Sequence, residues 1–213
     1  NKEAEGKAYW DIGGAQHSPD HKLLAYAVDD RGSELYTIRV RDLDTGEDLA
    51  DTIADTRGGM VWANDGKTLF YVRLDDNHRP RFVYRHIIGT PTADDVLIYE
   101  EKDIGFYVAL AETQSGKYVL IDAHDHQSSE VYLIDSDAPL EPMRMIAPRK
   151  HGHEYSVEHH GDDLIITTNA DAEDFRICTA PAAAPQQENW REVVPHRPGC
   201  LILDTVAYRD HLV

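Results

Sequence analysis

Apolar and polar positions alternate in short stretches along most of this chain. The stretch Glu34–Val40 is one example, and Arg81–Ile87 has the same pattern. A period of two, built from β-branched and aromatic residues, is typical of β-strands. We find no amphipathic pattern of helical period over ten or more residues. The sequence therefore predicts an all-β protein.

A polar turn followed by a β-rich run occurs four times. In the first occurrence Ser18–Lys22 precedes Leu23–Val28, and the later turns end at Lys67, Lys117 and Asp163. The four anchor positions 22, 67, 117 and 163 are 45, 50 and 46 residues apart. Asp and Gly in these turns tolerate the positive φ that tight hairpins require. The chain therefore contains a repeated unit.

Each unit holds four strand-sized runs. In the second unit they are Gly59–Trp62, Thr68–Val72, Arg81–Ile87 and Val96–Tyr99. A unit of this length with four strands matches one blade of a β-propeller. A β-sandwich made of regular hairpins is the alternative. We favour the propeller because the repeated unit is four strands long.

The repeat divides residues 1–213 into a partial propeller of about four four-stranded blades, with the start of a fifth. The approximate blades are 9–57, 58–104, 105–152 and 153–199, and the next one starts at 200–213. We expect the first strand of that next blade at Cys200–Asp204. The chain begins without Met and ends inside an apolar run at Val213, so we expect it to be part of a longer protein. A partial propeller would expose strand edges.

The composition narrows the range of partners. Hydrophobic residues make up 41% and charged residues 28%, which is typical of a globular, soluble chain. The net charge of -18 argues against nucleic acid and against an anionic membrane surface as partners. No apolar run approaches the roughly 20 residues that span a bilayer. An acidic surface attracts cationic ligands, although solubility alone also explains this charge.

The cysteines and the first residues bear on the compartment. Cys178 and Cys200 are the only cysteines, too few for a disulfide framework in a chain of this length. No signal peptide is recognisable at the start of the sequence. We therefore predict a cytoplasmic location.

The known motifs of catalysis and cofactor binding are missing from the sequence. None of the seven serines lies in a Gly-x-Ser-x-Gly elbow, and neither a P-loop nor Gly-x-Gly-x-x-Gly occurs. The pairs Gly13-Gly14 and Gly58-Gly59 fit places where strands crowd together or turn. We predict that this chain contributes no catalytic residue and no cofactor-binding residue.

Twelve histidines suggest a metal site at first sight. They include two groups: His151, His153, His159 and His160, and His124 and His126. The zinc motif His-Glu-x-x-His fails because Val157 stands where His153-Glu154 would need a second histidine. We expect surface and turn histidines, and we predict no metal-binding residue and no cofactor.

Three acidic segments could also suggest chemistry. Asp42-x-Asp44 and Asp171–Asp174 resemble parts of calcium loops, but neither continues to the required Gly and distal Glu. Turn chemistry explains both segments. Glu100 and Glu101 are neighbours on a predicted strand and would point to opposite faces. We expect them to be edge charges or partners of Lys or Arg rather than an acid/base pair.

Several longer stretches together resemble a known family. They are Val61–Gly66, Arg85–Pro91, Leu97–Asp103, His153–Val157 and Trp190–Pro195. In this order and spacing they resemble the propeller of oligopeptidase B (protease II) enzymes, in the prolyl oligopeptidase family of serine peptidases. The likeness extends from about Tyr9 to Val213.

The resemblance implies a two-part enzyme. A seven-bladed propeller would cap a C-terminal α/β-hydrolase domain of the same polypeptide, which carries the Ser, Asp and His of the triad. The propeller would narrow access so that only short peptides enter, and oligopeptidase B-like members cleave after Lys or Arg. This chain would then be the gating portion and inactive alone. Its excess of carboxylates would favour cationic peptides as substrates.

Two other functions are compatible with a propeller. The first is a stand-alone propeller that binds a protein or peptide, and the interrupted fifth unit argues against it. The second is a propeller enzyme with its site on the axis, such as a lactonase or a glycosidase. That enzyme would need convergent carboxylates or a metal, which the spacing does not suggest.

Overall fold

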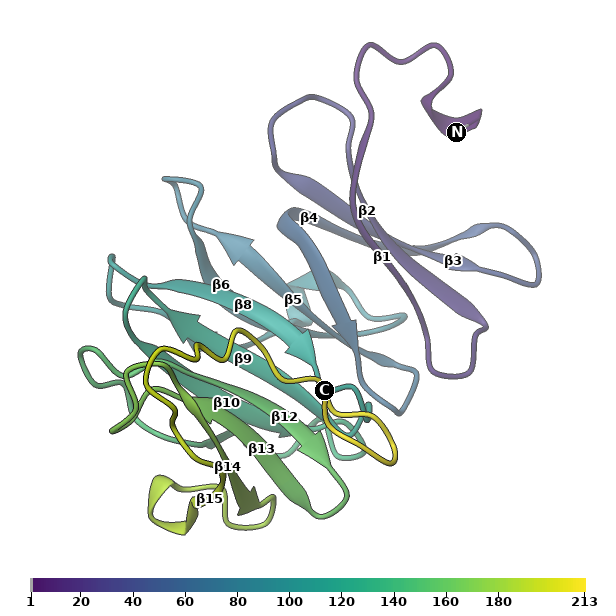
Figure 1. Ribbon diagram of the computed structural model, residues 1–213. Helices are drawn as coiled ribbons and strands as arrows, with labels where there is room; N and C mark the ends of the chain where they lie inside the picture. Colours follow the sequence, from purple (N-terminus) through teal and green to yellow (C-terminus); the bar gives the residue numbers. More distant parts are fainter. Residues whose placement is uncertain (1) are drawn as a thin grey trace. The chain divides into compact units, whose positions relative to one another are not determined.

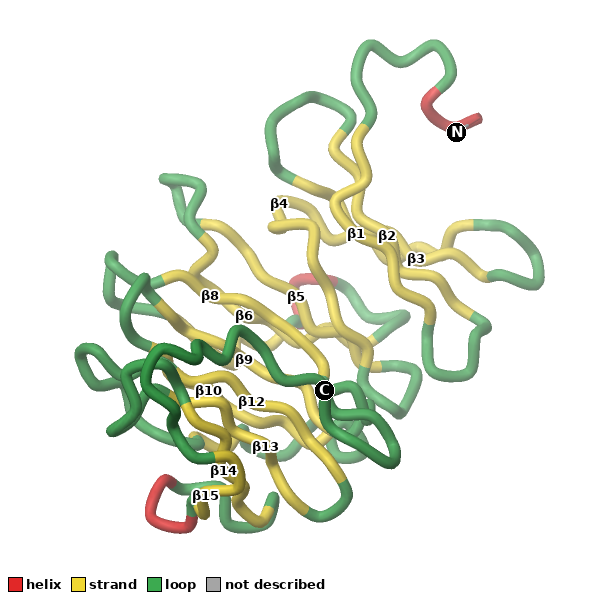
Figure 2. Tube along the Cα trace, viewed as in Figure 1, coloured by secondary structure: helices red, strands yellow, loops and turns green. Residues whose placement is uncertain are grey.

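The computed structural model describes residues 2–213, and their fold is all-β, as predicted (Figures 1 and 2). The helices in this part of the chain are the 3-10 turns η1 (Lys2–Ala4), η2 (Thr92–Asp94) and η3 (Gln187–Asn189). None of the helices between residues 2 and 213 has the length and apolar character needed to cross a membrane. The chain divides after Leu110 into two compact units, which we describe separately.

Unit 1 contains one antiparallel sheet in which each strand pairs with the next strand in the sequence (Figure 1). Its strands are β1 (Asp11–His17), β2 (Leu23–Asp29), β3 (Tyr36–Asp42), β4 (Asp48–Trp62), β5 (Thr68–Leu74), β6 (Pro80–Ile87) and β7 (Val96–Glu100). The central strands β2 and β5 are apolar at nearly every position and largely buried. A continuous apolar run of this length is typical of a strand covered on both faces.

Strand β4 bends in its middle. Up to Thr56 it pairs with β3 and from Thr56 onwards it pairs with β5, and the register with β5 shifts between Thr56 and Met60. Gly58 lies at the bend with a φ of 95°. β4 thus closes one set of four strands and opens the next. The boundary predicted between residues 57 and 58 falls inside this strand, and the division into blades stays a prediction.

The two halves of the unit 1 sheet share a core. Trp62, on the second half of β4, is 3% exposed, and its indole N–H donates to the backbone oxygen of Gln16 on β1 at 2.9 Å. The backbone N–H of Trp62 donates to the Gln16 side chain at 3.1 Å. The buried residues of this core are Ala25, Ala27, Ile38, Val40, Ile53, Met60, Trp62, Leu69 and Tyr71.

Unit 2 contains two antiparallel sheets of four strands each, with the boundary between the units falling inside β8. The first has the order β8 (Tyr107–Glu112), β9 (Tyr118–His124), β10 (Ser129–Asp135) and β11 (Arg144–Met145). The second has the order β12 (Tyr155–His160), β13 (Asp163–Thr168), β14 (Arg176–Pro181) and β15 (Arg191–Val194). Four strands in chain order are what the repeat predicts.

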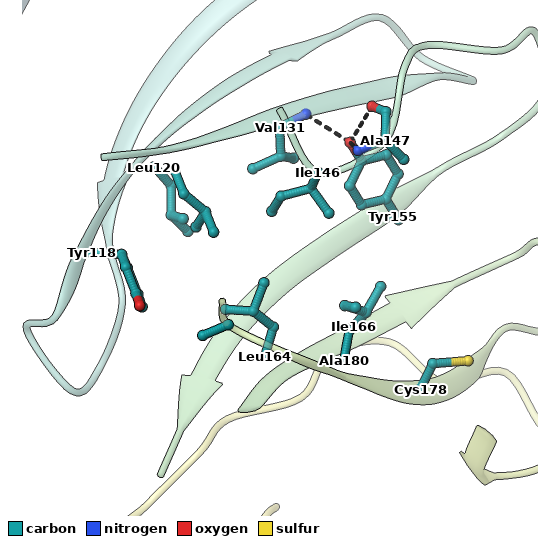
Figure 3. Packing of buried hydrophobic residues seen from close by; sticks show 12 residues of the cluster. Tyr118, Leu120, Val131, Ile146, Ala147, Tyr155, Leu164, Ile166, Cys178 and Ala180 are labelled. Carbon is teal, nitrogen blue, oxygen red and sulfur yellow. Dashed lines mark hydrogen bonds between the residues drawn. The ribbon is translucent and has the colours of Figure 1, made fainter. Parts of the chain in front are cut away.

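Tyr155 connects the two sheets of unit 2. Its hydroxyl donates to the backbone oxygen of Ala147 at 2.7 Å and accepts from the N–H groups of Val131 at 2.8 Å and Ala147 at 3.3 Å (Figure 3). Tyr155 belongs to a core of apolar side chains from both sheets, among them Leu120, Val131, Ile146, Leu164, Ile166, Cys178 and Ala180. Tyr155 is 3% exposed.

A residue of positive φ occurs in all four turns. It is a glycine in three of them, as predicted, whereas in the first turn it is His21. His21, Gly66, Gly116 and Gly161 lie just before the anchor positions, and their φ values are 59°, 64°, 69° and 64°. In the second turn the Asp65 carboxylate accepts the backbone N–H groups of residues 67 and 68 at 2.9 and 2.8 Å. The repeat is therefore visible in the backbone as well as in the sequence.

The strand expected at Cys200–Asp204 does not form. The backbone N–H of Ile202 donates to the backbone oxygen of Asp174 at 3.1 Å, and Thr205 bonds to the Thr167 side chain at 2.8 Å. Neither contact is a backbone pairing with a strand, so Cys200–Asp204 forms no ladder. Beyond β15 the described chain contains one isolated bridge, Ala207 with Leu212. The start of a further blade stays a prediction.

Candidate functional site

A pocket of about 550 Å³ opens on unit 1 at the turns β2–β3 and β5–β6 and at the bend of β4. We call it the tyrosine pocket. It is lined by Tyr9, Asp11, Glu34, Tyr36, Arg57, Leu74, His78, Pro80 and Tyr107. Its volume lies in the range of small-ligand sites.

Two glycines make room for the Tyr36 ring in the wall of the pocket. A Cβ on Gly13 would lie 2.7 Å from this ring, and one on Gly58 would lie 3.0 Å from it. A Cβ on Gly14 would lie 2.7 Å from the backbone oxygen of Gly58. The crowding predicted for the glycine pairs is thus confirmed at these three positions, whereas Gly59 has open space around its Cα.

The wall around Tyr36 carries negative charge. The Tyr36 hydroxyl donates to Asp11 Oδ2 at 2.6 Å, and this bond, followed by burial, raises the pKa of Tyr36 to about 12. Burial and then the charges of Asp11, Asp29 and Glu34 raise the pKa of Tyr9. Carboxylates from β1 and from the β2–β3 turn therefore act on the same region of the pocket.

The β2–β3 turn holds Glu34 in place. The carboxylate of Asp29, a residue that is 2% exposed, accepts the backbone N–H groups of Arg31 at 2.8 Å and Glu34 at 2.7 Å. Burial acts to raise the pKa of Asp29, but the N–H donors of the turn outweigh it, and the pKa lies below its usual value. Glu34 has a φ of 60°, which is uncommon for a residue with a side chain. The turn fixes this strained residue in the pocket wall.

One positive side chain, Arg57, lies in the same pocket together with a histidine. Arg57 comes from the bend of β4, and His78 comes from the β5–β6 turn with a φ of 59°. The guanidinium of Arg79 lies 5.5 Å from the centre of the Tyr107 ring and holds it by a cation–π contact. Between residues 2 and 213 no ion pair joins Arg57 to Asp11 or Glu34.

These groups suit the binding of a charged ligand. A carboxylate accepts hydrogen bonds from a cation, and a guanidinium can pair with an anion in a bidentate manner. The pocket can therefore hold a ligand with charges of both signs, between aromatic walls.

The family model described as the N-terminal β-propeller domain of prolyl oligopeptidase matches residues 1–213. The chain belongs to this family. Dipeptidyl aminopeptidase BI from Pseudoxanthomonas mexicana is 40% identical over 194 residues, which are 90% of this chain and 27% of that protein. Protease 2 from Moraxella lacunata is 37% identical over 183 residues, which are 85% of this chain and 26% of that protein. The chain thus spans about a quarter of these relatives.

Solved structures lead to the same family. Oligopeptidase B from Trypanosoma brucei, in a closed form with covalently bound antipain, is 33% identical, with a TM-score of 0.90. The match covers 100% of this chain and 30% of that one. Oligopeptidase B from Leishmania major is 31% identical, with a TM-score of 0.85, over 92% of this chain and 28% of that one. The resemblance to oligopeptidase B is confirmed.

Arg85–Pro91 is one of the stretches that resemble oligopeptidase B. It contains His86, which is the centre of a buried polar network. His86 is fully buried, its Nδ1 lies 2.6 Å from Asp95 Oδ1, and its Nε2 lies 2.9 Å from Asp51 Oδ1. Asp51 Oδ1 also accepts the Gly89 N–H at 2.6 Å, and Asp95 Oδ2 accepts the Tyr71 hydroxyl at 2.7 Å. The His86 network is internal to unit 1 and closed to substrates, because the side chains of His86, Asp51 and Asp95 are at most 3% exposed.

A serine and a histidine meet in unit 2. Ser115 Oγ lies 2.8 Å from His159 Nδ1 and also accepts the Lys117 backbone N–H at 3.2 Å. Within residues 2–213 no carboxylate bonds to the other ring nitrogen of His159. A catalytic pair needs such a third group to orient its base. We interpret the pair as a link between the β8–β9 turn and β12.

The histidine-rich stretch after residue 150 is partly internal. His153 is 5% exposed, its Nε2 lies 3.0 Å from Thr168 Oγ1, and burial lowers its pKa. His159 is 9% exposed. The expectation of surface and turn histidines was therefore wrong for these two, which are covered by the packing of the sheets. Within the described residues no cluster of three or more His, Cys, Asp or Glu is placed to hold a metal ion.

The acidic segments serve mainly as turn caps and ion-pair partners. Asp42 accepts the backbone N–H groups of Asp44 and Thr45 at 2.9 and 2.8 Å, so the turn interpretation is confirmed there. Glu100 pairs with Arg81 at 2.9 Å, as expected. Glu101 is not an exposed edge charge. This residue is 4% exposed and accepts the Tyr99 hydroxyl at 2.7 Å and the Asp103 N–H at 2.8 Å.

The raised tyrosine pKa values predict a loss of stability at alkaline pH. Tyr36, next to Asp11, and Tyr26, which is buried beside Asp48, have pKa values of about 12, against about 10 in an unfolded chain. Their contribution to stability is present below pH ~10 and is lost as the pH rises towards ~12. We expect the urea midpoint to fall across this window, together with a rise in tyrosinate absorbance. If the urea midpoint stays constant across this pH window, the two tyrosines do not contribute in this way. The same holds if the midpoint falls equally in the double variant Tyr26→Phe/Tyr36→Phe.

Proposed function

We propose that this chain is the substrate-gating propeller portion of a serine oligopeptidase that hydrolyses short peptides after Lys or Arg. The observation that supports the proposal most is the match of the propeller family model to residues 1–213. Relatives named protease 2 and oligopeptidase B agree with it, at 37% and 33% identity. The chain spans 26% and 30% of their lengths, so we assign the chemistry to the rest of the longer protein.

Two physical features fit this role. The sequence contains no Gly-x-Ser-x-Gly elbow, so we propose that the chain is inactive alone and acts with a C-terminal α/β-hydrolase domain. The net charge of -18 creates a field that favours the approach of cationic peptides. A cap of this charge would therefore add to the preference for Lys and Arg, beyond the pocket that holds the side chain next to the cleaved bond.

The test compares the 213-residue chain with the longer protein that contains it. The substrate is a short fluorogenic peptide with Arg before the reporter group, and a matched peptide carries citrulline, the uncharged isostere. We expect the longer protein to cleave the Arg peptide and the 213-residue chain to cleave neither. The rate with Arg should fall as salt screens the field, whereas the rate with citrulline should change little.

Three outcomes would contradict the proposal. Cleavage by the 213-residue chain alone, blocked by a serine-directed inhibitor, would place the chemistry in this chain. If the longer protein cleaves the citrulline peptide as fast as the Arg peptide, the proposed specificity for Lys or Arg is wrong. If the cleavage rate of the Arg peptide does not depend on ionic strength, the negative charge of the chain does not favour the approach of cationic peptides.

We also propose that the protein is located in the cytoplasm. Cys178 is buried and Cys200 is exposed, and both are free thiols. An exposed free thiol persists best in a reducing compartment. Cell fractionation with immunodetection tests this directly, and recovery with secreted or periplasmic markers would contradict it.

A further inference from the structure

We propose that the tyrosine pocket binds the C-terminal basic residue of a peptide, that is, a Lys or Arg with a free α-carboxylate. Such a peptide is the product of cleavage after Lys or Arg, so the source of this ligand rests on the proposed function. The pocket would then hold released product, at a site on the propeller.

The carboxylates of Asp11 and Glu34 supply the half of the site that binds the cation. Asp11 uses Oδ2 to accept the Tyr36 hydroxyl, and Oδ1 has no hydrogen bond within residues 2–213. The Glu34 carboxylate has neither a hydrogen bond nor an ion pair in the described chain. A guanidinium or an ammonium group can donate to both side chains at once.

Arg57 supplies the half that binds the anion. Its side chain is exposed, and in the part of the chain that the structure describes it forms no ion pair. A guanidinium binds a carboxylate through two parallel hydrogen bonds. A C-terminal Lys or Arg carries both charges on one residue, separated by a short methylene chain. A basic residue in the middle of a peptide lacks the second charge and would leave Arg57 unpaired.

The three tyrosine rings suit the rest of such a residue. Aromatic faces pack on methylene groups and attract a cation, and Arg79 already uses the Tyr107 ring in this way at 5.5 Å. The Tyr36 ring is seated on Gly13 and Gly58, and the Tyr9 ring lies against Gly32, where a Cβ would be 3.5 Å away. The Tyr36 ring is also held by the hydrogen bond of its hydroxyl to Asp11, so it loses little freedom on binding, which favours affinity.

Other small ligands fit the lining less well. A phosphate would be attracted by Arg57 but repelled by Asp11 and Glu34, which face the same cavity. A divalent cation would prefer a cluster of oxygen ligands, and no cluster of three metal-binding side chains occurs in residues 2–213. The combination of two carboxylates, one guanidinium and aromatic walls points to an amphoteric ligand with a basic side chain.

The first part of the test changes only the ligand. The longer protein, with its active serine blocked by a small fluorophosphonate, is titrated calorimetrically with the peptide N-acetyl-Gly-Gly-Arg as the free acid. Two comparison peptides have a C-terminal amide or have citrulline in place of Arg. We expect each change to weaken binding about tenfold, because each removes one charge-assisted contact. Misfolding cannot produce this result, since the protein is the same in all three titrations.

The second part changes the pocket. We expect Glu34→Gln to weaken the binding of the Arg peptide about tenfold and that of the citrulline peptide little. We expect Arg57→Gln to abolish the difference in affinity between the free acid and the amide. Asp30→Asn and Arg31→Gln are the matched controls, because these exposed residues lie in the same turn and outside the lining. Both controls should leave binding unchanged.

The proposal is overturned if the free acid and the amide bind equally well, or if Glu34→Gln weakens the citrulline peptide as much as the Arg peptide. Binding is measured with the serine blocked, so it does not depend on turnover. Cleavage after other residues would defeat the proposed function and leave the binding result standing. Cleavage after Arg without binding that depends on the pocket would defeat this inference alone.

Discussion

Replacement of His86 by alanine is expected to destabilise unit 1 by about 3–5 kcal/mol, because it leaves a buried cavity and removes one hydrogen bond from each of two buried carboxylates. The imidazole lies between Asp51 and Asp95 at 2.9 and 2.6 Å, and its side chain is fully buried. Without it, two carboxylates that are at most 3% exposed face each other across a cavity. Burial keeps water from replacing the lost hydrogen bonds, so the loss of stability should be large.

Native-state hydrogen exchange measures this loss in unit 1 separately from unit 2. We expect the slowest amides of β4, β5 and β6 to exchange roughly two to three orders of magnitude faster in His86→Ala. The matched control is His78→Ala, because His78 is an exposed histidine of the same unit and should change stability by at most ~0.5 kcal/mol. Equal effects of the two substitutions would contradict a stabilising role of the network.

The sequence predicted well those strands whose pattern is strong by itself. β2 and β5 are continuous apolar runs and β6 alternates, and all three form close to the expected positions. Four strands were expected in each unit, but the pattern gave no residue range for β1 and β15. β1 has the sequence Asp-Ile-Gly-Gly-Ala-Gln-His, and β15 is four residues long. Such segments become strands because β2 and β14 offer them a ladder, which propensity does not encode.

The pocket could not be predicted from local sequence. Its lining comes from residues 9 to 107, and no two of its charged residues form a motif. The glycine pairs were the usable signal, since they predicted crowding at the place where Tyr36 is now seated. His86 gave no signal of its own either. A histidine in a strand pattern looks exposed, and its burial depends on Asp51 and Asp95, which are distant in sequence.

The stretches that carry the family resemblance are largely structural. Trp62 bonds across the unit 1 core, His86 forms the buried network, and Tyr155 connects the sheets of unit 2. Each is a polar group that must find a partner inside a protein core. The resemblance therefore identifies the scaffold, and the charged lining of the tyrosine pocket lies mostly outside these stretches. Specificity can change there without loss of the fold.

Removal of one oxygen from unit 2, by Tyr155→Phe, is expected to cost about 2–3 kcal/mol of stability. The hydroxyl serves two N–H groups, of Val131 and Ala147, and donates to the Ala147 oxygen. Phenylalanine keeps the ring in the core but leaves these backbone groups unpaired where water does not enter, since Tyr155 is 3% exposed.

The measurement is the exchange rate of β10 and β12 amides, with Tyr208→Phe as the matched control. Tyr208 is also in unit 2 and is 47% exposed, and its hydroxyl makes no hydrogen bond within residues 2–213. The change in stability on Tyr208→Phe should therefore be close to zero. If Tyr155→Phe loosens β10 and β12 together, the hydroxyl couples the two sheets, because Val131 lies on β10 and Tyr155 on β12. If β12 alone loosens, the ring packing holds β10 and the hydrogen bonds do not.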